Sequence, residues 1–199
     1  ISLFRWESSV DSRDVTQIID FERVGEIESQ IWEANGHGKV DGVVALDTVV
    51  LQRMLGLTGA KVTTPGGDVL DGSTTSDFLL NGVYKKYPKG DQQDAIFALV
   101  ADAAAEGIFG NIGKVNIAKF ASVLKDSTEE GRIAIYMAND AEEAVLEDFG
   151  FAGTVSSDTK VPETGIYMSA CYGGKMFYYL ASDIDVGKGS KNPDGSMTY

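Results

Sequence analysis

The spacing of apolar residues changes along the chain between a helical period and the short runs typical of strands, which predicts an α/β fold. Residues 18–33 carry apolar side chains at helical spacing and predict a helix that Gly36 ends. Residues 40–47 form a short apolar run bounded by acids, the pattern of a central strand buried on both faces. Asp47 is suited to cap a following helix over residues 48–55, which Gly56 would end.

The same alternation continues toward the C-terminus. Helices are predicted over residues 78–84 (capped by Thr74 or Thr75), 92–106, 117–124 and 141–149 (capped by Asp140), and strands over residues 60–64 and 132–137. Residues 165–169 and 175–180 are rich in β-forming residues and predict an antiparallel pair. We therefore predict one α/β domain over residues 1–199, with a mixed central sheet sandwiched by helices.

Charge narrows the classes of partner. Thirty acidic residues against 17 Lys plus Arg give a formal net charge of −13. Such a field repels phosphate backbones and anionic lipid surfaces, so we expect no nucleic-acid partner. An anionic ligand would need a local cluster of cations.

The ends of the chain suggest a fragment of a longer protein. The sequence starts at Ile1, and Met197–Tyr199 follow a turn-like Asn-Pro-Asp-Gly, as the first residues of another strand would. No apolar run approaches the roughly 20 residues that span a bilayer. We expect any membrane anchor to lie outside this chain.

Several ordered segments resemble one bacterial family. They are residues 40–47 (VDGVVALD), 51–59 (LQRMLGLTG), 79–84 (LLNGVY), 131–133 (GRI), 174–176 (GKM) and 178–180 (YYL). This set, over about residues 30–182, resembles the bacterial domain-of-unknown-function family four thousand and twelve (DUF4012), found in envelope proteins of Gram-positive organisms. The resemblance implies an extracytoplasmic, cell-envelope location.

A second resemblance is to the LytR-CpsA-Psr family, which transfers glycopolymers from polyprenyl-diphosphate carriers onto peptidoglycan. It rests on the order of strand, helix and Leu-Asn-Gly across residues 40–94 and implies a LytR-CpsA-Psr-like fold. The chain departs from that pattern at Arg53, where an acid is common, and at Lys85 and Lys86, near where arginines hold the diphosphate.

Four aspartates are candidate metal ligands. Asp41 and Asp47 share one face of the predicted strand, and Asp91 and Asp94 share one face of a helix start. Together they would suit Mg²⁺, which prefers carboxylate oxygens and substrate phosphates. The alternative is that Asp47 and Asp91 cap helices and that Asp41 ends a strand.

Arg53, Lys85, Lys86 and Lys89 are the candidate ligands for a phosphate group in this acidic chain. Lysine binds phosphate as a point charge and lacks the bidentate fork of arginine. The alternative is a solvated helix end whose cations offset the helix dipole. His37 is interpreted as a surface loop residue and Cys171 as a packing residue, so neither is a candidate nucleophile or base.

Two hypotheses follow from these residues and resemblances. The first is a domain that binds or transfers an envelope glycopolymer or its polyprenyl-phosphate carrier, with Mg²⁺ as the cofactor if it is catalytic. The second is a non-catalytic binding or assembly module of the cell envelope on the same fold. The sequence identifies no catalytic residue for either.

Overall fold

The computed structural model of the protein describes residues 15, 17–155, 165–168, 176–185 and 187–198. The chain divides into two units, Ile1–Ser169 and Ala170–Tyr199. The first contains α2 (Phe21–Ala34), β1 (Gly42–Leu46), α3 (Thr48–Thr58), β2 (Val62–Thr63), β3 (Val69–Leu70), α4 (Thr75–Asp77), the π-helix η2 (Phe78–Gly82), α5 (Val83–Lys86), α6 (Gly90–Asn111), the 3₁₀ turn η3 (Ile112–Lys114), α7 (Ile117–Glu129), β4 (Ile133–Met137) and α8 (Asp140–Asp148). The second contains the 3₁₀ turn η4 (Met176–Tyr179), β5 (Ser190–Lys191) and β6 (Met197–Thr198).

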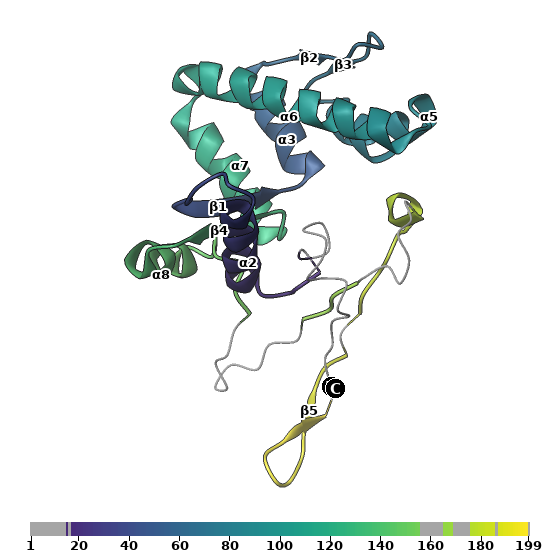
Figure 1. The fold of residues 1–199 in the computed structure, drawn as a ribbon. Coiled ribbons are helices and arrows are strands. Elements are labelled where there is room, and N and C mark those ends of the chain that lie inside the picture. The colour runs from purple at the N-terminus through teal and green to yellow at the C-terminus, as the bar shows by residue number, and fades with distance from the viewer. Residues whose placement is uncertain (1–14, 16, 156–164, 169–175, 186, 199) are drawn as a thin grey trace. The chain divides into compact units, whose positions relative to one another are not determined.

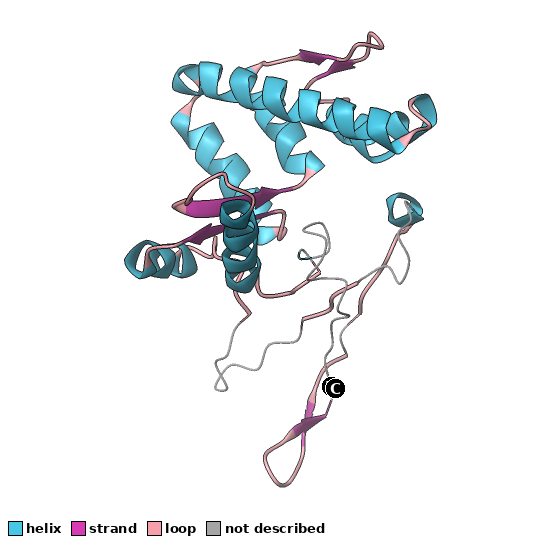
Figure 2. Ribbon diagram, in the orientation of Figure 1, coloured by secondary structure: helices cyan, strands magenta, loops and turns pink. Residues whose placement is uncertain are grey.

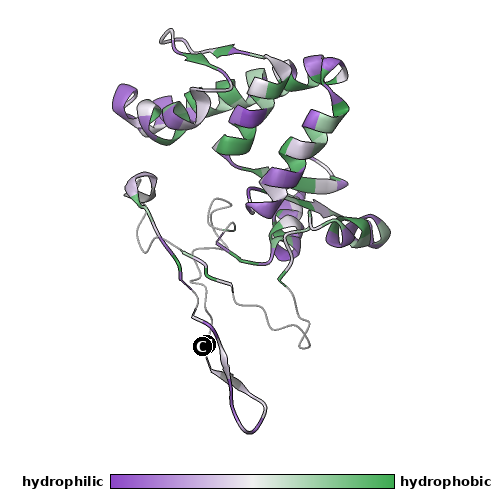
Figure 3. Ribbon diagram, turned by 180° about the vertical axis from the view of Figure 1, so that it is seen from behind, coloured by the Kyte–Doolittle hydropathy of each residue, from purple (hydrophilic) through white to green (hydrophobic). Residues whose placement is uncertain are grey.

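The hydrophobic core of the first unit lies where α3 and α6 meet the hairpin of β2 and β3 (Figure 1). Helix α6 contributes a stripe at i, i+4 spacing, and α3 contributes Leu55, which is completely buried. The buried cluster comprises Leu55, Val62, Leu70, Phe78, Leu79, Val83, Ile96, Val100, Ala104 and Ile108. Hydrophobic residues, green in Figure 3, recur along α3 and α6 for this reason.

Helix α6 is longer than the helix predicted over residues 92–106. Together with η3 it forms a helical stretch, Gly90–Lys114, that is long and apolar enough to cross a membrane by length and composition alone. Its stripe of Ile96, Val100, Ala104 and Ile108 packs into the core. Of the apolar window in this stretch 22% is buried, so the expectation of an anchor outside the chain stays a prediction.

Strands β1 and β4 pair antiparallel, and helix α2 packs against both (Figure 1). The close approach depends on Gly25, because a Cβ there would lie 2.3 Å from Cγ of Tyr136 on β4. Tyr136 is the Cα partner of Val43, so the side chains of Val43 and Ala45 also face α2. The predicted strand over residues 40–47 is thereby confirmed in position.

The predicted burial of strand β1 on both of its faces is wrong. Val44 is 58% exposed and Leu46 is 50% exposed, on the face of the pair away from α2. Within the described ranges, β1 pairs with β4 alone, and the face that carries Val44 and Leu46 is covered incompletely. Among the described residues, each sheet has two antiparallel strands (Figure 2), so the mixed central sheet is not what this part of the chain forms. The broad expectation of an α/β fold is confirmed.

Other boundaries differ for local reasons. Helix α3 passes through Gly56 and ends at Thr58, where Gly59 caps it with a left-handed φ of 70°. Helix α8 is capped by Asn139, whose side chain accepts from two backbone N–H groups, and Asp140 is its first residue. The strand predicted over residues 175–180 is wrong, because residues 176–179 form a 3₁₀ turn. The strand expected at the end of the chain is confirmed as β6, which pairs with β5 across residues 192–196.

The prediction of one domain over residues 1–199 stays a prediction. Residues 165–168 form no regular structure, and residue 169 lies outside the described residues, as does Cys171.

Candidate functional site

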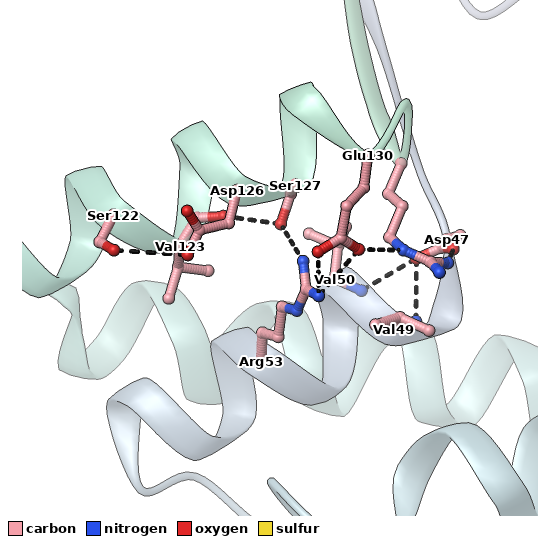
Figure 4. A network of polar contacts seen from close by, with 10 residues as sticks. Asp47, Val49, Val50, Arg53, Ser122, Val123, Asp126, Ser127 and Glu130 are labelled. Atoms are coloured by element: carbon pink, nitrogen blue, oxygen red, sulfur yellow. Dashed lines mark hydrogen bonds and ion pairs between the residues drawn. The ribbon is translucent and has the colours of Figure 1, made fainter.

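A polar network joins the start of α3, the end of α7 and the start of β4 (Figure 4). It begins at Asp47, because the chain leaves β1 in an extended conformation and turns at once into α3. One Asp47 carboxylate oxygen, Oδ1, accepts from the backbone N–H groups of Val49 and Val50, at 2.9 Å each. The predicted helix cap is therefore confirmed.

The second oxygen of the Asp47 carboxylate, Oδ2, accepts from Nη1 of Arg132 at 2.5 Å. Arg132 directly follows Gly131, which has a φ of +66° and lets the chain turn from α7 into β4. The Arg132 backbone is also fixed, because its carbonyl accepts from the Asp47 N–H at 3.2 Å. The pair thus joins two segments that are distant in sequence.

Arg53 lies in the second turn of α3 and points toward α7 (Figure 4). Its guanidinium donates to both carboxylate oxygens of Glu130, at 2.7 and 2.9 Å, and to Oγ of Ser127 at 3.1 Å. Glu130 accepts in addition from Nε of Arg132 at 2.5 Å. The network therefore runs without a break from Asp47 through Arg132 and Glu130 to Arg53.

The electrostatics of this network are balanced. Hydrogen bonds from Arg53 and then Arg132 hold the pKa of the Glu130 carboxyl below its ordinary value. In turn, the hydrogen bond to Glu130 and the one to Asp47 raise the pKa of Arg132. Two carboxylates and two guanidinium groups neutralise one another, so the network presents no surplus charge to a phosphate or a metal ion.

The predicted phosphate ligands are not gathered by the described contacts. Arg53 is engaged by Glu130 on α7, whereas Nζ of Lys86 donates to Asp68 Oδ2 at 2.6 Å and to the Gly66 carbonyl at 2.7 Å. This contact holds the pKa of the Asp68 carboxyl below its ordinary value. Lys85 and Lys89 are exposed, Lys85 at the end of α5 and Lys89 directly before α6.

The predicted metal ligands are also spread out. Asp41 and Asp47 flank the five residues of β1, and six steps along the strand at about 3.3 Å each separate them by about 20 Å, so they cannot hold one ion together. Asp91 and Asp94 are exposed in the first turns of α6, and Lys89 rather than Asp91 occupies the N-cap position. Within the described ranges, no three His, Cys, Asp or Glu side chains are placed to hold a metal ion.

Two crevices in the first unit lie apart from these residues. One, of about 290 Å³, is lined by Gly56, Gly59, Lys61, Asp71 and Gly72 among others. The other, of about 500 Å³, is mostly apolar and is lined by Leu124, Phe149 and Phe151, with Lys125 and Glu129 beside them. Neither is lined by Arg53, Lys85, Lys86 or Lys89, so neither combines a cavity with the predicted cations.

Sequence reasoning missed three members of the network: Ser127, Glu130 and Arg132. Glu130 and Ser127 belong to α7 and the turn that follows it, which looked like an ordinary polar helix end. One signal was present, because residues 131–133 were among the segments that carried the family resemblance. That resemblance pointed to Arg132, but nothing in the segment indicated that Asp47 is the partner of its guanidinium.

The double role of Asp47 gives a test. We expect Asp47→Ala to lower the free energy of unfolding by about 0.5–2 kcal/mol, the usual cost of a lost N-cap. Asp47→Asn should cost less, because asparagine caps helices as well as aspartate and loses only the charge beside Arg132. Urea unfolding followed by circular dichroism measures both. Equal losses in the two variants would assign the stability to the ion pair instead.

Comparison with known proteins adds a family and nothing more specific. The model of a family described as protein of unknown function (DUF4012) matches residues 2–84. The predicted family is thereby confirmed, over a stretch that contains the segments at 40–47, 51–59 and 79–84 but not those beyond residue 130. No curated protein matches the chain, and no solved structure does.

Proposed function

Because residues 2–84 match the model of the DUF4012 family, we propose that the chain is a non-catalytic binding or assembly module of the bacterial cell envelope. The observation that supports this proposal is the closed polar network, in which Arg53 and Asp47 already have partners. A catalytic site needs a base, a nucleophile or a metal ion held ready for substrate. Here the best candidates for such roles stabilise the junction of α3, α7 and β4.

The solitary histidine supports the same proposal. His37 lies in the exposed segment after α2 and stacks on Trp32, with ring centroids 4.2 Å apart. General-base catalysis by histidine requires a nucleophile within hydrogen-bond reach and a group that orients the imidazole. The described contact of this ring is aromatic packing at the surface, which supplies neither.

The extracytoplasmic, Gram-positive envelope location belongs to the proposal and rests on the family resemblance. The LytR-CpsA-Psr-like fold is likewise proposed from the order of segments over residues 40–94. The rival hypothesis is that the chain binds or transfers a glycopolymer or its polyprenyl-phosphate carrier, and the exposed Lys85 and Lys89 favour it. In that case Lys86 would have to exchange Asp68 for a phosphate.

A binding titration separates the two functions. The chain is titrated by calorimetry with a soluble polyprenyl-diphosphate analogue and Mg²⁺, as wild type and as Lys85→Ala/Lys86→Ala. The matched control is Lys114→Ala/Lys119→Ala, which removes the same charge from two exposed lysines near the start of α7. We expect no binding by any of the three, because the net charge of −13 repels the ligand where cations do not converge.

The rival function has its own signature in this titration. Binding that Lys85→Ala/Lys86→Ala weakens several-fold or more, and that the control leaves unchanged, would replace the proposal with carrier binding.

A further inference from the structure

In the part of the chain that the structure describes, one backbone edge of strand β1 is unpaired. The Asp41 carbonyl accepts from the Ala138 N–H at 2.8 Å, and the Asp47 N–H donates to the Arg132 carbonyl at 3.2 Å. In an antiparallel pair, the residues that bond to the partner alternate with residues whose N–H and C=O groups point the other way. Since residues 41 and 47 bond toward β4, residues 43 and 45 do so too, and Gly42, Val44 and Leu46 direct their backbone groups outward.

No described contact uses these outward groups. Where the structure describes the chain, β1 pairs with β4 alone, and no backbone hydrogen bond reaches Gly42, Val44 or Leu46 from the other side. The side chains of Val44 and Leu46 are 58% and 50% exposed on the same strand. Backbone donors and acceptors therefore lie beside exposed aliphatic side chains.

The sequence of this edge carries no protection. Natural proteins block open edges with lysine, proline, bulges or very short strands. Strand β1 is Gly-Val-Val-Ala-Leu, without a charge or a proline, and its five residues pair in register along their whole length. We propose that the outer edge of β1 is the docking site of this binding module, and that it receives an extended segment of a partner protein as a third strand. This inference rests on the proposed function and names its kind of partner.

Charge identifies the character of that segment. Exposed Asp41 flanks the Gly42 end of the strand, and exposed Asp140 lies two residues beyond Ala138, which bonds to Asp41. The chain as a whole carries −13. The partner strand therefore alternates apolar with polar residues, and its apolar side chains cover Val44 and Leu46. It carries Lys or Arg at the end beside Asp41.

The same charges disfavour a second copy of this chain as the occupant. A two-fold antiparallel pairing centred on Val44 would place Asp41 opposite Asp47 at both ends of the joint. Like charges directly opposite each other destabilise paired strands. The edge fits a basic strand better than it fits itself.

The test uses the full chain and a labelled peptide that alternates Val and Thr between terminal lysines. Binding is followed by fluorescence anisotropy, and amide hydrogen exchange is measured at residues 42–46. We expect Val44 and Leu46 to exchange fast in the free protein and to become protected in the complex, while Val43 and Ala45 are protected in both.

Two variants block the edge without touching the ladder to β4. Val44→Pro removes the outward N–H, and Val44→Lys places a charge on the exposed face. Each should weaken peptide binding about tenfold, the effect of about 1.4 kcal/mol. Val145→Lys is the matched control, because Val145 is 52% exposed on α8 and should leave binding unchanged.

Three results would overturn the inference. They are absence of peptide binding, binding that Val44→Pro and Val44→Lys leave intact, and a concentration-dependent dimer that Val44→Lys dissociates. The last would assign the edge to a second copy. None of them involves the diphosphate analogue, so failure of the edge is distinguishable from failure of the proposed function.

Discussion

Replacing Leu55 by alanine is expected to cause a large loss of stability, greater than that from a lost helix cap. Leu55 is completely buried in the cluster that α3, α6 and the β2–β3 hairpin share. Leucine to alanine at such a site costs about 2–5 kcal/mol, because apolar contacts are lost and the cavity closes only partly. For a chain of this length that corresponds to a melting temperature lower by roughly 5–15 °C, measured by calorimetry.

Leu80→Ala provides the control for this prediction. Leu80 is 42% exposed in η2, so the same change of side chain removes much less buried surface there. We expect a loss of less than about 1 kcal/mol. A melting temperature that falls equally in the two variants would place the core elsewhere than around Leu55.

Local chemistry made part of this fold predictable from sequence. Asp47 was predicted as a helix cap because an acid between a strand and a helix can accept from backbone N–H groups two or three residues further along. Its carboxylate accepts from the N–H groups of Val49 and Val50. The positions of β1, α2 and α7 follow similarly from apolar spacing within one segment. Where both partners of an interaction lie in one turn of chain, the sequence is sufficient.

Interactions between distant segments were not predictable in the same way. Arg53 and Glu130 are 77 residues apart, and Asp47 and Arg132 are 85 apart. An exposed acid or base can pair with many others, and no local pattern selects among them. Arg53 was therefore interpreted as a phosphate ligand, whereas it holds α3 against the end of α7.

The burial of β1 failed for a related reason. A continuous apolar run is typical of strands covered on both faces, but coverage depends on the elements that pack there. Among the described residues, α2 packs on the face of Val43 and Ala45, whereas Val44 and Leu46 stay half exposed. An apolar run that the described part of the chain leaves half exposed is what a strand-accepting edge requires. The failed prediction and the proposed docking site thus have one physical origin.

The last prediction concerns the contact between α3 and the turn before α4. A Cβ at Gly72 would lie 2.4 Å from the Cα of Gly56, which real side chains do not tolerate. We expect Gly72→Ala to lower the free energy of unfolding by about 1–3 kcal/mol, because the obstacle is backbone and cannot rotate aside. Thermal and urea unfolding, compared with wild type, measure the loss.

Two further glycines make this test specific. Gly113→Ala meets no atom within 4 Å and should leave stability within about 0.5 kcal/mol of wild type. Gly56→Ala meets the Gly72 Cα at 3.1 Å, a milder conflict, and alanine inside a helix regains about 0.5–1 kcal/mol, so its net effect should be small. The expected order of loss is therefore Gly72, Gly56, Gly113. If Gly72→Ala proved as neutral as Gly113→Ala, α3 would not lie in close contact with the turn at Gly72. The crevice that Gly56 and Gly72 line would then be larger than about 290 Å³.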